Sequence, residues 1–262
     1  MILLKTIVYI DGFNLYDAIR NRNCKWLNVM VLSQAVLPLQ YSIKNVKYYT
    51  ARVSGIAGSG QPKRQQIYIS ALQTVPGIEI FYGNFLAKTV CRPLASIPIA
   101  NREVNDGSQN HKIPAGDHRV MPDPTLTDSR QEVMPVGSYP LKSGKVNPHP
   151  SPVQDAVLVR VHWMEEKGSD VNLASHLIND AWSGHYEAAA VISNDTDLVE
   201  PIRIVTREIN KPVVVLCASP RGAAAARKAV ATDVLHISST HLRASLFPDT
   251  IAGTSIIKPP TW

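Results

Sequence analysis

The stretch from Ala188 to Val199, A-A-A-V-I-S-N-D-T-D-L-V, constrains the fold of this chain more than any other part of the sequence. It begins as an unbroken apolar run of strand length and continues into two aspartates, Asp195 and Asp197, which a helical pattern of apolar residues follows. This order predicts a buried strand that delivers carboxylates to its C-terminal end. In an open parallel sheet, ligands bind in the crevice outside that end, because loops from several strands converge there.

The N-terminal segment repeats this arrangement. Thr6–Ile10 is apolar and strand-like, and Asp11 and Asn14 follow directly in the sequence D-G-F-N. Parallel strands end at the same edge of a sheet, so we expect the acids of both segments to lie near each other.

Strand and helix patterns alternate along most of the chain, which predicts an α/β fold with a mostly parallel sheet. Besides the two segments above, strands are expected at about 45–53, 78–82, 156–163, 212–217 and 234–237, and helices at about 15–20, 29–36, 62–75 and 221–230. A further helix, capped by Ser169 or Asp170, has Val171, Ala174, Leu177, Ile178 and Ala181 as its expected apolar face.

One long segment interrupts the alternation. Residues 101–152 are dense in Pro, Gly, Ser, Asn and Asp, so they predict an irregular insertion within a single domain that spans 1–245. The basic side chains of the insertion fit a flap over a polyanion, and a tolerated surface insertion explains them equally well. We expect 246–262 to form an extended C-terminal tail.

Composition excludes several classes of protein. A chain of 262 residues that is 45% hydrophobic can bury a sizeable core. Its three cysteines form no C-x-x-C pair, which argues against a disulfide framework or a cysteine zinc site. The apolar N-terminus is too short to span a membrane, so we expect a soluble, cytoplasmic protein without a membrane partner. The sequence leaves the oligomeric state open, a homo-oligomer included.

The charge balance is basic, with a formal net charge of +6 and a pI of about 9.2. A polyanionic partner fits a basic surface around an acidic site if metal ions bridge the acids to the polyanion. Surplus solvated lysines account for the charge as well, so charge favours neither hypothesis.

Four aspartates are the candidate catalytic and metal-binding residues: Asp11, Asp170, Asp195 and Asp197. Carboxylates drawn together repel one another, and a bound cation relieves that repulsion. Mg²⁺ and Mn²⁺ prefer oxygen ligands and lower the pKa of a bound water, which suits phosphodiester hydrolysis. The alternative for each Asp is a local role in a cap or a turn.

Further polar residues lie beside these acids in the sequence. Asn14 is suited to hold a carboxylate, a metal-bound water or a phosphate, and Ser193 and Asn194 could position the same group. Lys167 could contact phosphate. Each also has an ordinary alternative as a turn, a strand end or a solvated surface residue. His176 is expected on the polar face of its helix or at the edge of the apolar face.

Three segments together resemble a known family. Y-I-D-G-F-N-L (Tyr9–Leu15), E-K-G-S-D-V-N-L-A (Glu166–Ala174) and V-I-S-N-D-T-D-L-V-E-P-I-R (Val191–Arg203) are similar to the NYN domain, in particular its LabA-like branch within the PIN-like nuclease superfamily. The motifs occur in the order of the family, and the resemblance covers residues 1–245 apart from the insertion.

The resemblance implies a PIN-like (Rossmannoid) three-layer α/β/α sandwich, a Mg²⁺ or Mn²⁺ site and ribonuclease activity on RNA. It assigns the metal to Asp11, Asp170, Asp195 and Asp197 and an assisting role to Asn14. Two departures are evident, since relatives commonly have Asp at the position of His176 and a short connection in place of the insertion. Two alternatives stay open: a weak or inactive RNA-binding or regulatory NYN module, and a metal phosphohydrolase that acts on DNA or small phosphoesters.

Overall fold

The structure is a computed structural model that describes residues 3–52, 60–93, 133–134, 156–219 and 225–260. The chain divides into two compact units. The first contains Met1–Leu86 and Glu165–Trp262, and the second contains Ala87–Met164. No helix within the described ranges is long and apolar enough to cross a membrane.

The strands follow each other in the order β4-β5-β3-β2-β1-β6-β7-β8. All pairings from β3 to β8 are parallel, whereas β4 pairs with β5 in antiparallel fashion. The bounds of the described strands are β1 Leu4–Asp11, β2 Tyr41–Ala51, β3 Ile78–Pro93, β4 Val133–Met134, β5 Ala156–Lys167, β6 Ala188–Ile192, β7 Val213–Cys217 and β8 Asp233–His236.

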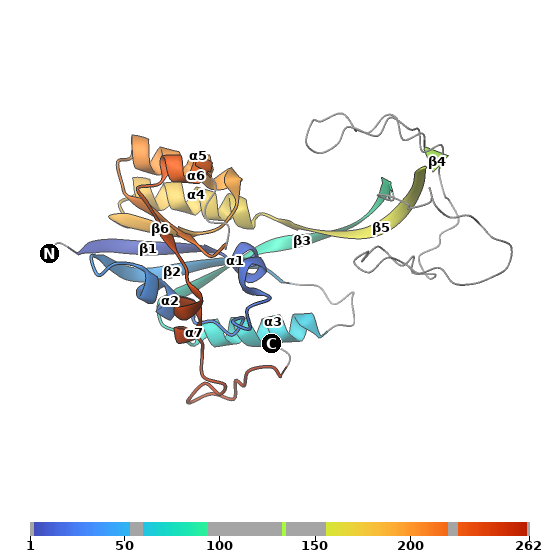
Figure 1. The fold of residues 1–262 in the computed structure, drawn as a ribbon, viewed down its shortest axis with the longest axis horizontal. Coiled ribbons are helices and arrows are strands. Elements are labelled where there is room, and N and C mark those ends of the chain that lie inside the picture. The colour runs from blue at the N-terminus through green and yellow to red at the C-terminus, as the bar shows by residue number, and fades with distance from the viewer. Residues whose placement is uncertain (1–2, 53–59, 94–132, 135–155, 220–224, 261–262) are drawn as a thin grey trace. The chain divides into compact units, whose positions relative to one another are not determined.

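Helices cover both faces of the sheet in the first unit, with α4, α5 and α6 on one face and α2, α3 and α7 on the other (Figure 1). The predicted three-layer α/β/α sandwich with a mostly parallel sheet is therefore confirmed. The described helices are α1 Gly12–Ile19, α2 Val29–Val36, α3 Gln61–Gln73, α4 Ser169–Trp182, α5 Val199–Arg203, α6 Ala225–Val230 and α7 Ser239–Ala244. A 3₁₀ turn at Thr196–Leu198 precedes α5, and a π-helical turn at Ile204–Glu208 follows it.

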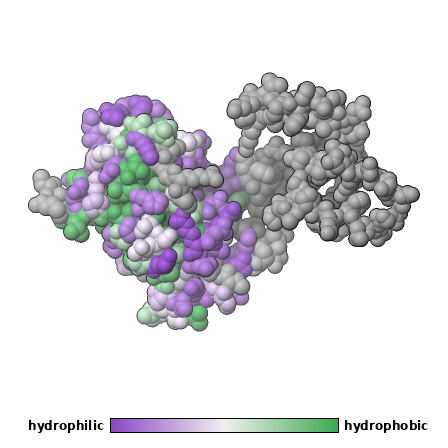
Figure 2. Space-filling model, viewed as in Figure 1, coloured by the Kyte–Doolittle hydropathy of each residue, from purple (hydrophilic) through white to green (hydrophobic). Residues whose placement is uncertain are grey.

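Two apolar cores, one on each face of the sheet, result from the two-residue period of the strands. In β1, Val8 and Ile10 pack into the core under α1, α2, α3 and α7, whereas Ile7 and Tyr9 pack into the core under α4 and α5. The strands β6 and β7 alternate in the same way. Figure 2 shows mainly hydrophilic residues over the helical layers on the face in view, with hydrophobic residues gathered between them.

The start of α4 differs from the prediction. Gly168 occupies the N-cap position with a φ of +97°, and the Glu166 carboxylate accepts the backbone N–H of Ser169 at 3.0 Å. Neither Ser169 nor Asp170 caps the helix. The predicted apolar face was also wrong at Val171, which is 67% exposed, because Leu173 and Leu177 set the rotation of the helix against the sheet.

Three other segments differ from the sequence prediction. β3 continues to Pro93 rather than stopping near residue 82, and α7 was not expected. Residues 246–260 turn back instead of extending, since Leu246 bridges to Leu27 and Thr250 bridges to Ile257. The predicted insertion at 101–152 lies outside the described residues except for β4.

Candidate functional site

The register of β1 and β6 brings the two acidic segments together. Ile10 lies opposite Ile192, so the next residues along the chain, Asp11 and Ser193, are neighbours at the C-terminal edge of the sheet. Ser193 Oγ donates to Asp11 Oδ2 at 3.0 Å. The site therefore begins where two central parallel strands end, as the strand patterns predict.

Asp11 is buried, with 2% of its surface exposed, and its carboxylate is held from three sides. The backbone N–H of Asn14 donates to Oδ1 at 3.0 Å, and Asn14 Nδ2 and Ser193 Oγ both donate to Oδ2. Burial raises the pKa of Asp11, and the charge of Asp195 adds to that rise; the hydrogen bonds from Asn14 and Ser193 oppose it without cancelling it.

Gly12 allows this turn to form, because α1 begins directly against β2. A Cβ atom on Gly12 would lie 2.7 Å from the Tyr48 ring and 2.7 Å from the Tyr49 carbonyl oxygen. The D-G-F-N sequence thus combines a carboxylate at a strand end with a residue small enough for α1 to start beside it.

The loop after β6 continues the same hydrogen-bond chain. The Asn194 N–H donates to Asn14 Oδ1 at 3.3 Å, and the Asp195 N–H donates to Ser193 Oγ at 3.0 Å. Asp195 caps the following 3₁₀ turn by accepting the Asp197 N–H at 3.0 Å. Asp195 therefore has a local structural role. Its second carboxylate oxygen and the exposed Asp197 carboxylate belong, with Asp11 and Asp170, to a group of acids that we call the acidic edge.

Asp170 approaches the same group of acids from the first turn of α4. Burial and the charges of Asp11, Asp195, Glu166 and Asp197 raise the pKa of Asp170 to about 6. The close approach of α4 depends on Gly83 in β3, where a Cβ atom would lie 2.7 Å from the Lys167 carbonyl oxygen. Four carboxylates from three parts of the chain thus share one electrostatic environment.

The donor chemistry of this edge fits a hard divalent cation, because every candidate ligand is a carboxylate and the acids repel one another. Within the described ranges, no three or more His, Cys, Asp or Glu side chains form a group placed to hold a metal ion. The fit to a metal therefore rests on donor type and charge.

Lys167 and His176 lie on either side of the start of α4. Lys167 is exposed at the end of β5, before the glycine that caps α4. His176 packs its ring 4.7 Å from that of Phe81, and its Nδ1 lies 2.8 Å from the Tyr49 hydroxyl. Burial and the nearby Lys47 lower the pKa of His176. The histidine is an aromatic packing residue of α4.

Arg227 in α6 was missed by sequence reasoning. Its side chain is only 3% exposed, and Nη1 donates to the Ser193 carbonyl oxygen at 3.3 Å. Nε has no hydrogen-bond partner in the described part of the chain. In the sequence, Arg227 belongs to an alanine-rich helical stretch with nothing to distinguish a buried cation from a solvated one.

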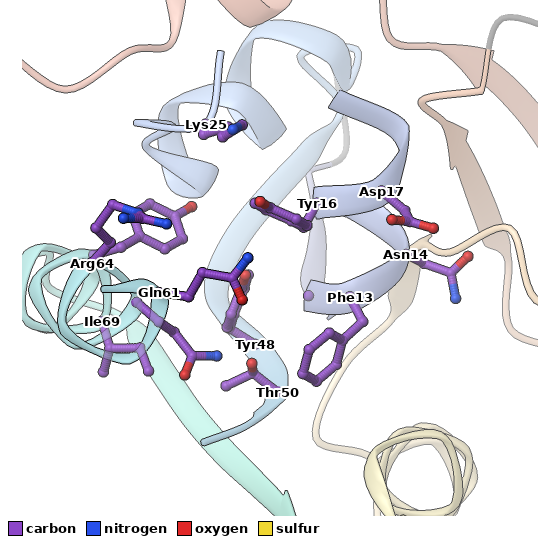
Figure 3. Close-up of a pocket in the computed structure, with 13 residues that line it drawn as sticks. Phe13, Asn14, Tyr16, Asp17, Lys25, Tyr48, Thr50, Gln61, Arg64 and Ile69 are labelled. Atoms are coloured by element: carbon purple, nitrogen blue, oxygen red, sulfur yellow. The ribbon is translucent and has the colours of Figure 1, made fainter. Parts of the chain in front are cut away.

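A cavity of about 460 Å³ adjoins the acidic edge on the α3 side of the sheet (Figure 3). Its walls come from α1, the end of β2 and the N-terminal half of α3, with Lys25 from the loop after α1. Asn14 belongs to both sites, since it lines the cavity and also binds Asp11. The sequence did not predict this cavity, because its residues come from four separate segments.

Comparisons with known proteins add one distant relative. No family model matches the chain. It is 24% identical to the 6-hydroxy-3-succinoylpyridine 3-monooxygenase HspA of Pseudomonas putida over 275 residues, which cover 99% of this chain and 75% of the relative. A solved structure of a Vibrio parahaemolyticus protein of unknown function is 14% identical with a TM-score of 0.45, covering 90% of this chain and 94% of that one.

Proposed function

We propose that this protein is a metal-dependent ribonuclease that hydrolyses RNA phosphodiester bonds at the acidic edge of the sheet. The proposal rests on the meeting of the Asp11 and Ser193–Asp197 segments at the ends of β1 and β6, where Ser193 Oγ donates to Asp11 Oδ2 at 3.0 Å. Asp170 of α4 belongs to the same group, since burial and the charges of Asp11, Asp195, Glu166 and Asp197 raise its pKa to about 6. Carboxylates from three chain segments that lie close enough to repel one another favour a bound cation. The basic charge of the whole chain, +6, favours a polyanionic substrate.

The ion that fits these donors is Mg²⁺ or Mn²⁺, held by Asp11, Asp170, Asp195 and Asp197. Such an ion lowers the pKa of a bound water and neutralises charge on a phosphoryl group. Within the protein, Asn14 and Ser193 fix the orientation of the Asp11 carboxylate. Arg227 supports the same loop by donating to the Ser193 carbonyl.

The test is cleavage of a mixed RNA and, separately, of single-stranded DNA, each with Mn²⁺ or with EDTA. The variants are Asp195→Asn, which keeps the side-chain size, and Asp249→Asn, a matched change at an exposed aspartate of the C-terminal segment. We expect Mn²⁺-dependent RNA cleavage by the wild type and by Asp249→Asn, and none by Asp195→Asn. Equal cleavage by all three proteins would reveal a contaminant and contradict the proposal.

The same experiment distinguishes the proposed ribonuclease from two alternative functions. RNA binding without cleavage, retained in EDTA and in Asp195→Asn, would identify an RNA-binding or regulatory module. Cleavage of DNA in preference to RNA would identify a different metal phosphohydrolase.

A second candidate function takes its substrate class from the Pseudomonas putida relative, whose name describes the oxygenation of a substituted pyridine. The similarity covers 99% of this chain, and it supports an enzymatic role more than a purely binding one. The cavity beside Asn14, with aromatic and cationic walls, is the observation that favours a small heteroaromatic acid as substrate. Binding of 6-hydroxy-3-succinoylpyridine by a protein that cleaves no RNA would select this candidate.

A further inference from the structure

The cavity beside the acidic edge combines flat aromatic faces, hydrogen-bonding groups and cations. It is lined by Gly12, Phe13, Asn14, Tyr16, Asp17, Lys25, Tyr48, Thr50, Gln61, Arg64, Gln65, Tyr68 and Ile69. Figure 3 shows Gln61 and Arg64 of α3 on one side of the cavity and Phe13 and Tyr16 of α1 on the other. Its volume of about 460 Å³ falls in the range of small-molecule sites, roughly 300–1,000 Å³.

The aromatic residues at the cavity differ in how firmly they are held. The Phe13 ring packs edge-on against Phe85 at 5.6 Å, and the Tyr68 hydroxyl donates to the Leu27 carbonyl at 2.9 Å. These contacts fix two walls of the cavity. Tyr16 is 39% exposed, so part of its side chain is open to contact with a ligand in the cavity.

Two hydroxyl groups of β2 line the cavity. Tyr48 is 6% exposed and Thr50 is 4% exposed, and both line the cavity from β2. Within the described residues, neither hydroxyl is among the fully buried polar atoms that lack a hydrogen-bond partner. Both line the cavity, where a hydroxyl can donate to or accept from a polar ligand or ordered water.

The charged groups at the cavity favour an anion. Lys25 and Arg64 contribute positive charge, and the Lys25 ammonium also lies 5.7 Å from the centre of the Tyr16 ring. The acid at the rim, Asp17, is paired with Arg20 at 3.3 Å and is exposed. An anionic group attached to a flat ring therefore matches the lining better than a purely apolar ligand does.

We propose that this cavity is a binding site for one nucleotide unit, a planar nitrogen heterocycle carrying a phosphate. The base stacks on Tyr16 and Phe13 and accepts or donates hydrogen bonds at Tyr48, Thr50 and Gln61. Arg64 and Lys25 bind the phosphate through charge-assisted hydrogen bonds. An RNA chain and a free nucleotide both supply this chemistry.

The position of Asn14 connects the cavity to the acids, since its side chain holds Asp11 and its residue lines the cavity. A nucleotide in the cavity would place its neighbouring phosphate towards the acidic edge. This role as a substrate subsite rests on the proposed ribonuclease function, whereas nucleotide binding itself does not.

The test measures binding of AMP, CMP, GMP and UMP to the full chain by calorimetry in EDTA, so that cleavage plays no part. Arg64→Ala is compared with Lys63→Ala, which removes an exposed charge of α3 that does not line the cavity. Tyr16→Ala is compared with Trp182→Ala, which removes an exposed aromatic side chain from α4. Thermal unfolding of each variant checks that the fold is retained.

We expect at least one nucleotide to bind the wild type and to bind about tenfold more weakly in Arg64→Ala and Tyr16→Ala, because one stacked base or one charged hydrogen bond contributes this much or more. The two control variants should bind like the wild type. No binding at millimolar concentration, equal binding by all variants, or equally tight binding of nicotinate, a pyridine carboxylate, would overturn the proposal.

A trinucleotide RNA distinguishes the two sources of the ligand. Tighter binding of the trinucleotide identifies an RNA chain, and equal binding identifies a free nucleotide. If Asp195→Asn abolishes RNA cleavage and Tyr16→Ala does not change the KM for RNA, the subsite is refuted and the ribonuclease function is retained. If the protein cuts no RNA and Tyr16→Ala abolishes nucleotide binding, the ribonuclease function is refuted and the nucleotide site is retained.

Discussion

At the residue scale, Asp170 reports most directly on the grouping of the acids. Burial and then the charge of Asp11 are the largest causes of its raised pKa, about 6. A carboxyl whose pKa is raised in the folded state adds stability below its unfolded pKa, about 4, and loses it as the pH rises through the folded value. In the absence of metal, Asp170 therefore makes the protein less stable at pH 7 than at pH 4.

Asp11→Asn is expected to lower the pKa of Asp170, because the substitution removes the largest charge contribution to that pKa while it keeps the side-chain size. The measurement is a carboxyl ¹³C NMR titration of metal-free protein, with Asp249→Asn as the remote control. The control should titrate like the wild type. An Asp170 pKa near 4 in the wild type would contradict the grouping of the acids.

Single residues also show what the sequence can predict. The positions of Asp11, Asn14, Ser193 and Asp195 were predictable because each lies within three residues of the end of an apolar strand, and parallel strands end at one edge. Arg227 was not predictable, because its burial depends on how α6 packs rather than on its neighbours in the sequence.

At the element scale, a buried ionic cluster stabilises the packing of α4 on the sheet. Asp180 of α4 accepts from Tyr9 Oη of β1 at 2.6 Å and from Lys47 Nζ of β2 at 2.6 Å. Burial raises the pKa of Asp180, but the hydrogen bonds from Lys47, Tyr9 and His185 outweigh it, so the net pKa is lowered. Its stabilising contribution is present above the unfolded pKa and is lost as the pH falls through the folded pKa.

Asp180→Ala is expected to lower the free energy of unfolding by about 3 kcal/mol, because it leaves the buried Lys47 ammonium unpaired. Urea unfolding at pH 7 measures this loss. Glu200→Ala is the control, since it breaks an exposed ion pair with Arg203 and should change stability little. If the two substitutions have equal effects, α4 is not held by this cluster.

The helix α4 also marks a limit of sequence patterns. Val171 and Leu173 are both apolar and two residues apart, so they point about 200° away from each other on a helix. The sequence alone does not decide which of them faces the sheet. The sheet decides it, because Leu173 and Leu177 together fit the core beside Tyr9. Val171 is left exposed.

At the scale of the whole molecule, the C-terminal segment completes a core that forms mainly from the N-terminal half. The Phe247 ring packs 5.6 Å from that of Trp26, and Trp26 Nε1 donates to the Pro248 carbonyl oxygen at 2.9 Å. This segment was predicted to be an extended tail, because short polar and proline-rich sequence does not reveal a partner more than two hundred residues earlier.

Phe247→Ala is expected to lower the free energy of unfolding by about 3 kcal/mol, because it opens a cavity beside the buried Trp26. Chemical unfolding followed by Trp fluorescence measures the change. Ile257→Ala removes a side chain that is 62% exposed, so it should be nearly neutral. A neutral Phe247→Ala would show that the C-terminal segment does not contribute to the core.

The layers of the fold could be predicted from the alternation of strand and helix patterns in the sequence, whereas the cavity could not. Strand and helix order decides which strand ends meet, and that order was visible in the sequence. The cavity depends on Lys25, Tyr48 and Arg64 converging from a loop, a strand and a helix, and no local pattern encodes that convergence.

We propose that Asp11, Asp170, Asp195 and Asp197 act together as one cation site. The most direct test is calorimetric titration of the metal-free protein with Mn²⁺ at pH 7, for the wild type, Asp170→Asn and Asp249→Asn. We expect saturable Mn²⁺ binding by the wild type and by Asp249→Asn, with binding at least about tenfold weaker in Asp170→Asn, since removing one charged ligand costs more than about 1.4 kcal/mol. Absent binding, or equal affinity in all three proteins, would contradict the proposal.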